Sequence, residues 1–185
     1  MEQNKMGIMP INKLLLSMSL PMMASMLVQA LYNIVDSIFV AKLSENALTA
    51  VSLAFPIQTL IIAIGVGTGV GANALLAKQL GEKKFERVNK TAMNAILLSF
   101  IYYVLFIIMG FVVVRPFYKS QVTAADVEIL EMGVEYLFIV CVGSLGLCLQ
   151  LIGEKLLQAT GKTVHSMIAQ GLGAITNIIL DPILI

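Results

Sequence analysis

Residues 14–35 read LLLSMSLPMMASMLVQALYNIV and contain no Asp, Glu, Lys or Arg. The hydrocarbon core of a bilayer is about 30 Å thick, so a helix needs roughly 20 apolar residues to cross it. Lipid offers no hydrogen-bond partner to the backbone, and a spanning segment must therefore satisfy its own polar groups as a helix. The stretch is too long for a signal-peptide core and no small-residue cleavage site follows it. It therefore predicts a retained transmembrane helix.

Four similar stretches follow along the chain, and they extend the same argument. None of them contains Asp, Glu, Lys or Arg, and the alternating ten-residue segments of a membrane β-barrel are absent. We therefore predict an all-α integral membrane protein with five transmembrane helices. The four stretches are residues 46–77, 91–114, 136–153 and 163–180. The expected spans are residues 14–41, 47–77, 91–114, 130–153 and 163–185.

The overall composition supports a membrane protein and excludes other classes. Hydrophobic residues make up 58% of the 185 residues and charged residues 12%, against about 45–50% and 25% in soluble domains. Twelve basic and eleven acidic residues nearly cancel, so the basic surface that nucleic-acid binding requires is not expected. Two cysteines are too few for a disulfide scaffold. The expected partner is the lipid bilayer, and no cofactor is expected.

The Lys and Arg residues predict the orientation, because short cytoplasmic connections are enriched in them. Nine of them lie on the side of the N-terminus and three on the other. We expect a multi-pass protein of the cell membrane with a cytoplasmic N-terminus. The nine are Lys5, Lys13, Lys78, Lys83, Lys84, Arg87, Lys90, Lys155 and Lys162, and the three are Lys42, Arg115 and Lys119.

Asp36 and Asp181 are the only charged residues expected within the spans. Asp36 is followed by the apolar run SIFVA and Asp181 by PILI. A carboxylate at the centre of a membrane helix costs about 2.5–3.5 kcal/mol, so such residues are usually functional or paired. At the helical rise Asp36 lies roughly 34 Å beyond Lys13, and Asp181 roughly 28 Å beyond Lys162. Both are expected at similar depth in the outer half of the membrane.

Polar neighbours accompany both carboxylates. Tyr32 and Asn33 precede Asp36 by four and three residues, and Asn177 precedes Asp181 by four, so each group shares one helix face. Two carboxylates close together in low dielectric resist double ionisation and favour a bound proton or Na⁺. These residues therefore predict a cation-coupling site. The alternative is that both carboxylates cap their helices in the wet outer interface.

Two prolines lie within the expected spans. Pro182 has no N–H and frees a carbonyl one turn earlier, and Pro21 should kink the first helix as a static bend or a hinge.

The two membrane aspartates do not match the motifs of a membrane protease. Intramembrane aspartyl proteases carry Tyr-Asp and Gly-x-Gly-Asp, whereas here Asp36 and Asp181 follow Val35 and Leu180. No enzyme is expected.

Several motifs, in order, resemble the multidrug and toxic compound extrusion (MATE) transporters. SLP at residues 19–21 and LYNIVD at residues 31–36 are similar to the first helix of that family. GVG at residues 69–71 with QLG at residues 79–81 resembles the end of its second helix. NIILDPILI at residues 177–185 resembles its fifth helix. The resemblance covers the whole chain.

The resemblance implies a twelve-helix antiporter of two six-helix lobes, of which this chain would hold most of one. It implies export of lipophilic, often cationic drugs or toxic compounds in exchange for Na⁺ or H⁺. A departure is Gln158, where relatives often carry arginine. The candidate residues are Asp36, Asn177 and Asp181 for Na⁺ or H⁺ with Tyr32 nearby, Gln29 and Asn33 for the substrate cavity, and Pro21 and Pro182 as hinges.

The resemblance also implies that a sixth helix and a C-terminal lobe are required for transport. The chain is accordingly expected to be an N-terminal fragment that is inactive alone. One alternative is a relative that flips lipid-linked oligosaccharides, although the spans lack the basic residues that such a cavity would carry. Another is a non-transporting membrane assembly module that dimerises through the glycines of residues 65–71, because small residues let helices approach closely.

Overall fold

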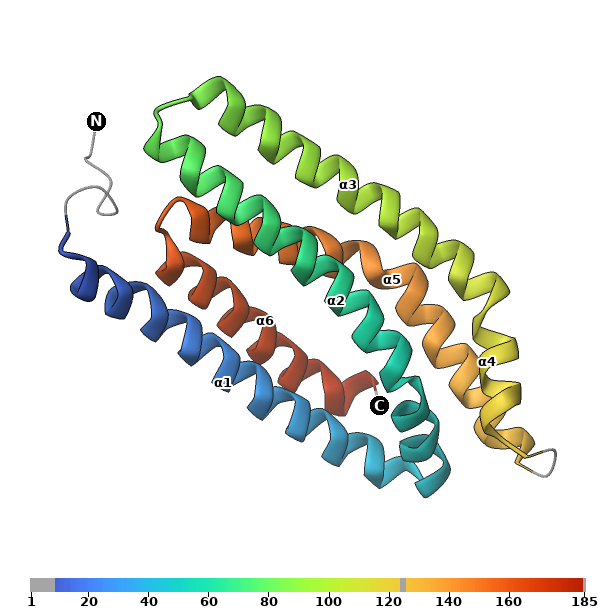
Figure 1. Cartoon of the computed structure of the whole chain (residues 1–185). Helices are drawn as coiled ribbons and strands as arrows, with labels where there is room; N and C mark the ends of the chain where they lie inside the picture. Colours follow the sequence, from blue (N-terminus) through green and yellow to red (C-terminus); the bar gives the residue numbers. More distant parts are fainter. Residues whose placement is uncertain (1–8, 124–125, 185) are drawn as a thin grey trace. The chain divides into compact units, whose positions relative to one another are not determined.

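Every regular element in the described part of the chain is an α-helix (Figure 1). The computed structural model describes residues 9–123 and 126–184, without the side chains of Leu43 and residues 181–184. The helices are α1 (Ile11–Leu43), α2 (Glu45–Gly81), α3 (Phe85–Val112), α4 (Val114–Gln121), α5 (Val127–Ala159) and α6 (Thr163–Leu184). All except α4 contain a segment long and apolar enough to cross a membrane. The predicted all-α fold with five transmembrane helices is confirmed.

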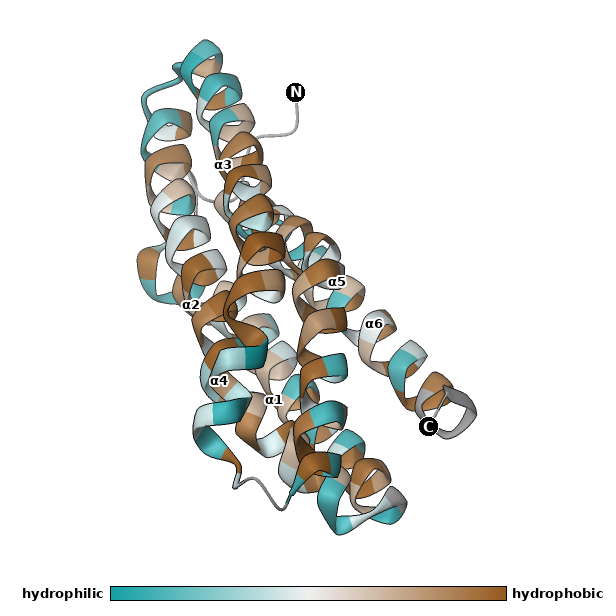
Figure 2. Cartoon of the chain, turned by 90° about the vertical axis from the view of Figure 1, so that its right-hand side faces the viewer, coloured by the Kyte–Doolittle hydropathy of each residue, from teal (hydrophilic) through white to brown (hydrophobic). Residues whose placement is uncertain are grey.

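The long helices follow the apolar stretches and end where polar residues gather. Figure 2 shows hydrophobic colouring along the middle of α3 and hydrophilic colouring at its start and at the end of α2. Ser44 separates α1 from α2, and its hydroxyl accepts a hydrogen bond of 3.0 Å from the Ala47 N–H. This N-cap satisfies one of the donors that a helix start leaves without an intrahelical partner. Pro56 lies inside α2, which continues through it.

The short helix α4 was not predicted. Its Val114 and Tyr118 are buried, whereas Arg115 and Lys119 are exposed, which is the i, i+4 pattern of a helix with one apolar face. The Tyr118 hydroxyl donates a hydrogen bond of 2.6 Å to the carbonyl of Ala50. The sequence interpretation missed α4 because eight residues are too few to give a clear period.

The chain divides into two compact units. Unit 1 contains residues up to Phe39, residues 71–92 and residues from Gly153 onward, and unit 2 contains residues 40–70 and 93–152. Unit 2 holds a buried apolar core in which both cysteines are free. This core consists of Ala54, Ile57, Ile61, Tyr102, Phe106, Val114, Tyr118, Leu137, Cys141 and Cys148.

Glycines allow close helix contacts at some positions and not at others. A Cβ placed on Gly65 would lie 2.6 Å from Leu151 Cδ1, so this glycine allows α5 to pack closely against α2. Apart from its chain neighbours and the nearby backbone of α2, no described atom lies within 4 Å of a Cβ built on Gly67 or Gly71.

Candidate functional site

The first group of predicted site residues lies on α1. Gln29 and Asn33 are exposed, while Tyr32 and Asp36 are half-buried. Tyr32 and Asp36 are four residues apart in a continuous helix and therefore share one face. Both take part in interactions within the described part of the chain. Asp36 is thus a partly shielded carboxylate inside a segment that is long enough to span a membrane.

The second group lies on α6. Asn177 is exposed on this helix. Asp181 and Pro182 belong to its backbone, and their side chains lie outside the described residues. In Figure 1, α6 runs alongside α1 and in the same direction, and both belong to unit 1. The structure therefore places the α1 segment that carries Asp36 and the helix α6 that carries Asp181 in one unit, and a site shared by the two residues stays a prediction.

Pro21 lies within α1 and has a polar neighbour one turn later. Because proline has no N–H, the carbonyl of Ser17 loses its usual helical donor. The Ser25 hydroxyl donates a hydrogen bond of 3.0 Å to the Pro21 carbonyl, and Ser25 is buried. Serine bonds of this kind often bend helices. The described contacts add a second bend-promoting residue beside Pro21, and the hinge motion itself stays a prediction.

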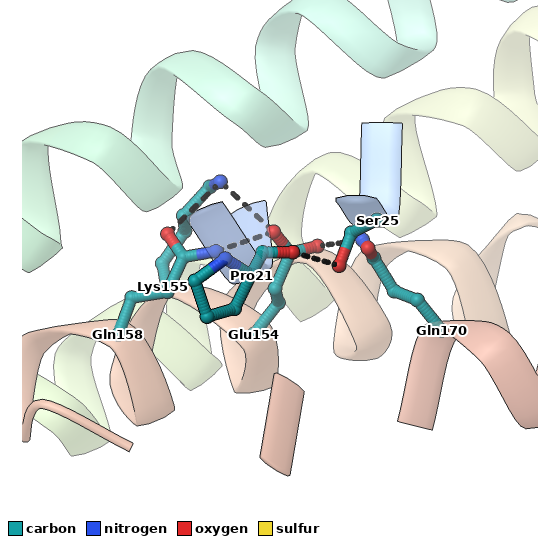
Figure 3. Close-up of polar contacts among 6 residues, drawn as sticks. All are labelled: Pro21, Ser25, Glu154, Lys155, Gln158 and Gln170. Atoms are coloured by element: carbon teal, nitrogen blue, oxygen red, sulfur yellow. Dashed lines mark hydrogen bonds and ion pairs between the residues drawn. The ribbon is translucent and has the colours of Figure 1, made fainter. Parts of the chain in front are cut away.

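A buried polar cluster joins α5 to α6 (Figure 3). We name it the Glu154 cluster, consisting of Glu154, Lys155, Gln158 and Gln170. Glu154 Oε1 accepts hydrogen bonds from Gln158 Nε2 at 2.6 Å and from Lys155 Nζ at 3.1 Å. Glu154 Oε2 accepts one of 2.6 Å from Gln170 Nε2 on α6. Both carboxylate oxygens are therefore satisfied by side chains.

The Glu154 cluster is shielded from its surroundings. The side chains of Lys155 and Glu154 are 15% and 12% exposed, and Gln158 is buried. Lys155 Nζ also donates to Gln158 Oε1 at 3.3 Å. Gln170 Oε1 is buried and has no hydrogen-bond partner among the described residues. A charge this well shielded is stable only with partners, so the cluster is an interlocked set rather than four independent contacts.

The Glu154 cluster begins just beyond the expected fourth span, residues 130–153, so the expectation that only Asp36 and Asp181 are charged within the spans stays a prediction. α5 continues as a helix to Ala159 and includes Glu154 and Lys155. The sequence interpretation had placed Lys155 in a cytoplasmic connection. The spacing of four between Glu154 and Gln158 was a signal that could have placed both on one helix face. The partner Gln170 had no such signal, because it lies on another helix.

No group of three or more His, Cys, Asp or Glu side chains is arranged to hold a metal ion within residues 9–123 and 126–180. The predicted Na⁺ ligands include Asp181, whose side chain lies outside that part. Asp36 and Asn177 offer carboxylate and amide oxygens, which suit a hard cation such as Na⁺. The predicted use of Na⁺ at Asp36, Asn177 and Asp181 therefore keeps its chemical basis and remains untested.

A comparison with models of protein families shows to which family the chain belongs. The model of the MatE family matches residues 21–183, which is nearly the whole chain. The chain belongs to the MatE family. The resemblance found in the motifs is thereby confirmed, and the chain is a multi-pass membrane protein of this transporter family.

Individual MatE relatives agree with this assignment. The chain is 30% identical over 176 residues to a curated protein described as an FAD transporter from Shewanella oneidensis, covering 95% of this chain and 38% of that protein. It is 32% identical over 176 residues to the multidrug export protein MepA of Staphylococcus haemolyticus, covering 94% and 38%. The chain thus spans 38% of the length of these two relatives.

A solved MatE-type structure agrees as well. It is described as the outward-facing conformation of a multidrug resistance MATE family transporter of the MOP superfamily. The match has a TM-score of 0.87 at 32% identity and covers 92% of this chain and 38% of that one. The helices of this chain therefore correspond to most of one lobe of such a transporter.

Proposed function

We propose that the full-length protein is an antiporter that exports lipophilic, often cationic compounds in exchange for Na⁺ or H⁺. The observation that carries this proposal is Asp36, a half-buried carboxylate within a membrane-spanning helix of a MatE-family chain. A carboxylate at this position is costly to insert and is kept where it binds a cation or a proton. Asn177 and Asp181 on α6 are proposed to complete the site, with Tyr32 beside it.

The absence of basic residues from the apolar stretches favours a cationic substrate. Within residues 14–35, 46–77, 91–114, 136–153 and 163–180 there is no Lys or Arg. A cavity lined by these stretches and Asp36 is therefore neutral to negative, and it attracts cations. Gln29 and Asn33 are exposed on α1 and are proposed to offer hydrogen bonds to the substrate.

A second candidate is export of FAD, which is supported by the 30% identity to a relative described as an FAD transporter. FAD carries a negatively charged pyrophosphate, so its binding would need donors or basic groups. The cationic substrate is therefore favoured on charge. Measuring transport of both kinds of compound in one preparation separates the two candidates.

The test uses the full-length protein in lipid vesicles with an imposed Na⁺ or pH gradient. Efflux of ethidium, a lipophilic cation, is measured beside efflux of FAD. Asp36→Asn should reduce gradient-driven ethidium efflux at least tenfold, because a neutral amide cannot exchange a proton or pair with Na⁺. The matched control is Asp126→Asn, the same chemical change at an exposed carboxylate outside the spans, which should leave efflux unchanged.

Two results would contradict the proposal. Full efflux in a folded Asp36→Asn variant would exclude a role of Asp36 in coupling, and gradient-driven transport of FAD without ethidium transport would favour the second candidate.

We further propose that the protein lies in the cell membrane with its N-terminus in the cytoplasm, on the basis of the Lys and Arg distribution. Labelling of a cysteine placed at Lys119 from outside intact cells, with no labelling at Lys84, is the expected result.

A further inference from the structure

The connection between α2 and α3 carries a concentration of basic residues. We name residues 78–90 the basic connection. It joins two helices that are each long and apolar enough to cross a membrane, since α2 ends at Gly81 and α3 begins at Phe85. Its charged residues are the basic Lys78, Lys83, Lys84, Arg87 and Lys90 and the acidic Glu82 and Glu86.

Backbone hydrogen bonds give the basic connection a defined shape. Lys83 adopts a left-handed conformation with φ of 58°, which ends a helix in the way a glycine usually does. The Lys84 N–H donates a 3.0 Å bond to the Gln79 carbonyl, and the Lys83 N–H donates one of 3.0 Å to that of Leu80. α3 starts at the next residue, Phe85. The turn is therefore tight, and the basic connection lies between the apolar stretches of residues 46–77 and 91–114.

Two of the basic residues are paired within the connection. Lys84 Nζ lies 2.6 Å from Glu82 Oε2, and Lys90 Nζ lies 2.7 Å from Glu86 Oε1. All four side chains are exposed, and exposed pairs of this kind are weak and easily exchanged. Because these ion pairs are weak, the basic residues of the connection can still attract a further anion.

The other basic residues give the connection an excess of positive charge. Lys78, Lys83 and Arg87 are exposed, and no ion pair joins them to another described residue. The hydrogen bond and the charge of Lys84 hold the pKa of Glu82 below its ordinary value, with smaller contributions from Lys78 and Arg87. The acidic side chain at the turn therefore already experiences a positive potential.

An aromatic side chain accompanies these charges at the membrane boundary. Phe85 is 63% exposed and lies between Lys84 and Arg87 in the sequence. An exposed aromatic ring flanked by basic residues is typical of segments that insert into the headgroup region of a bilayer. Figure 1 shows the start of α1 and the connection from α5 to α6 at the same end of unit 1, and these carry Lys13 and Lys162.

We propose that the basic connection binds the phosphate of anionic phospholipids in the leaflet that it faces, with Lys83 and Arg87 contacting the headgroup and Phe85 inserted beside the acyl chains. Basic residues next to a transmembrane helix attract anionic lipid, and each contributes about 1 kcal/mol, which is about fivefold in relative affinity at 25 °C. The apolar stems of the Lys83 and Arg87 side chains can extend along the lipid surface while their charged ends reach the phosphates.

The test measures lipid contact directly at Phe85. The sequence contains no tryptophan, so Phe85→Trp introduces a fluorophore at the connection of the full-length protein. Its signal is the difference between this variant and the same protein with Phe85. The protein is placed in bilayers of zwitterionic phosphatidylcholine with a fraction of phosphatidylglycerol, and either lipid is brominated so that it quenches nearby tryptophan.

We expect brominated phosphatidylglycerol to quench the fluorescence of the Phe85→Trp variant several-fold more effectively than brominated phosphatidylcholine at equal mole fraction. Lys83→Gln with Arg87→Gln should remove most of this preference at low ionic strength and bring the quenching by the two lipids close to equal, because each charge contributes up to about fivefold. The charge-conserving pair Lys83→Arg with Arg87→Lys should retain it. Lys119→Gln removes an exposed charge from α4 outside the spans and should also retain it.

Equal quenching by the two lipids would overturn this proposal, as would an unchanged preference after removal of both charges or an equal loss in the Lys119→Gln control. Inorganic phosphate at the same concentration of charge should not displace the lipid, and if it does, the connection is an anion site that does not select a membrane. None of these outcomes depends on transport.

Discussion

Replacing Gly133 with alanine should destabilise the packing of α5 on α4. A Cβ at this position would overlap with Cε1 and Cζ of the Tyr118 ring and lie 2.8 Å from its Cδ1. The ring cannot easily move, because it is fully buried and its hydroxyl is bonded to Ala50. Overpacking costs about 1–3 kcal/mol, and three short contacts to a rigid ring place this substitution at the upper end. Alanine regains about 1 kcal/mol of helix propensity, so the net loss should be about 2 kcal/mol.

The assay is the free energy of unfolding of the full-length protein in bicelles. The control is Gly143→Ala on the same helix, where no described atom lies within 4 Å of the added Cβ, and it should be neutral or stabilising by up to about 1 kcal/mol. In a Tyr118→Ala background the effect of Gly133→Ala should change sign, because the ring is gone. Equal effects of Gly133→Ala in both backgrounds would refute the steric explanation.

Two further predictions concern buried polar groups. Glu154→Gln should lower the free energy of unfolding by about 2–4 kcal/mol, because it leaves the Lys155 cation shielded without an anion, and addition of Lys155→Met should recover part of this loss in the same denaturation assay. Burial raises the pKa of Tyr118, which lies outside the spans, from 10 to about 12, with a smaller contribution from Tyr136. The stability that the protonated Tyr118 hydroxyl contributes is complete below pH 10 and is lost as the pH rises towards 12. The thermal unfolding midpoint should therefore fall between these two pH values, and Tyr118→Phe should remove this part of the pH dependence. An equal fall of the midpoint in Tyr118→Phe would contradict the assignment of this pH dependence to Tyr118.

The transmembrane helices could be predicted from the sequence because the information is local. Each apolar stretch is long enough to cross the membrane, and a backbone in lipid has few alternatives to a helix. Asp36 could be selected for the same reason, because a carboxylate is conspicuous within an apolar helix. The motif NIILDPILI at residues 177–185 further indicated the family, which the MatE match confirmed.

The exact ends of the helices could not be predicted from the positions of the charged residues alone. α5 extends to Ala159 and includes Glu154 and Lys155, because a helix can continue past the apolar stretch when its charged side chains find partners. At its other end, α5 begins at Val127, three residues before the expected span of residues 130–153. The Thr123 hydroxyl donates a hydrogen bond of 2.5 Å to Asp126 Oδ2 just before this start.

The sequence by itself determined the class of protein, the presence of five membrane-spanning helices and the carboxylate on α1, because each depends on residues close together in the chain. Only the tertiary structure decided which polar groups are buried together. Gln170 reaches Glu154 across 16 residues, and Tyr118 reaches Ala50 across 68. Neither hydrophobic period nor charge spacing specifies which helices become neighbours, because close packing depends on the shapes of both partners.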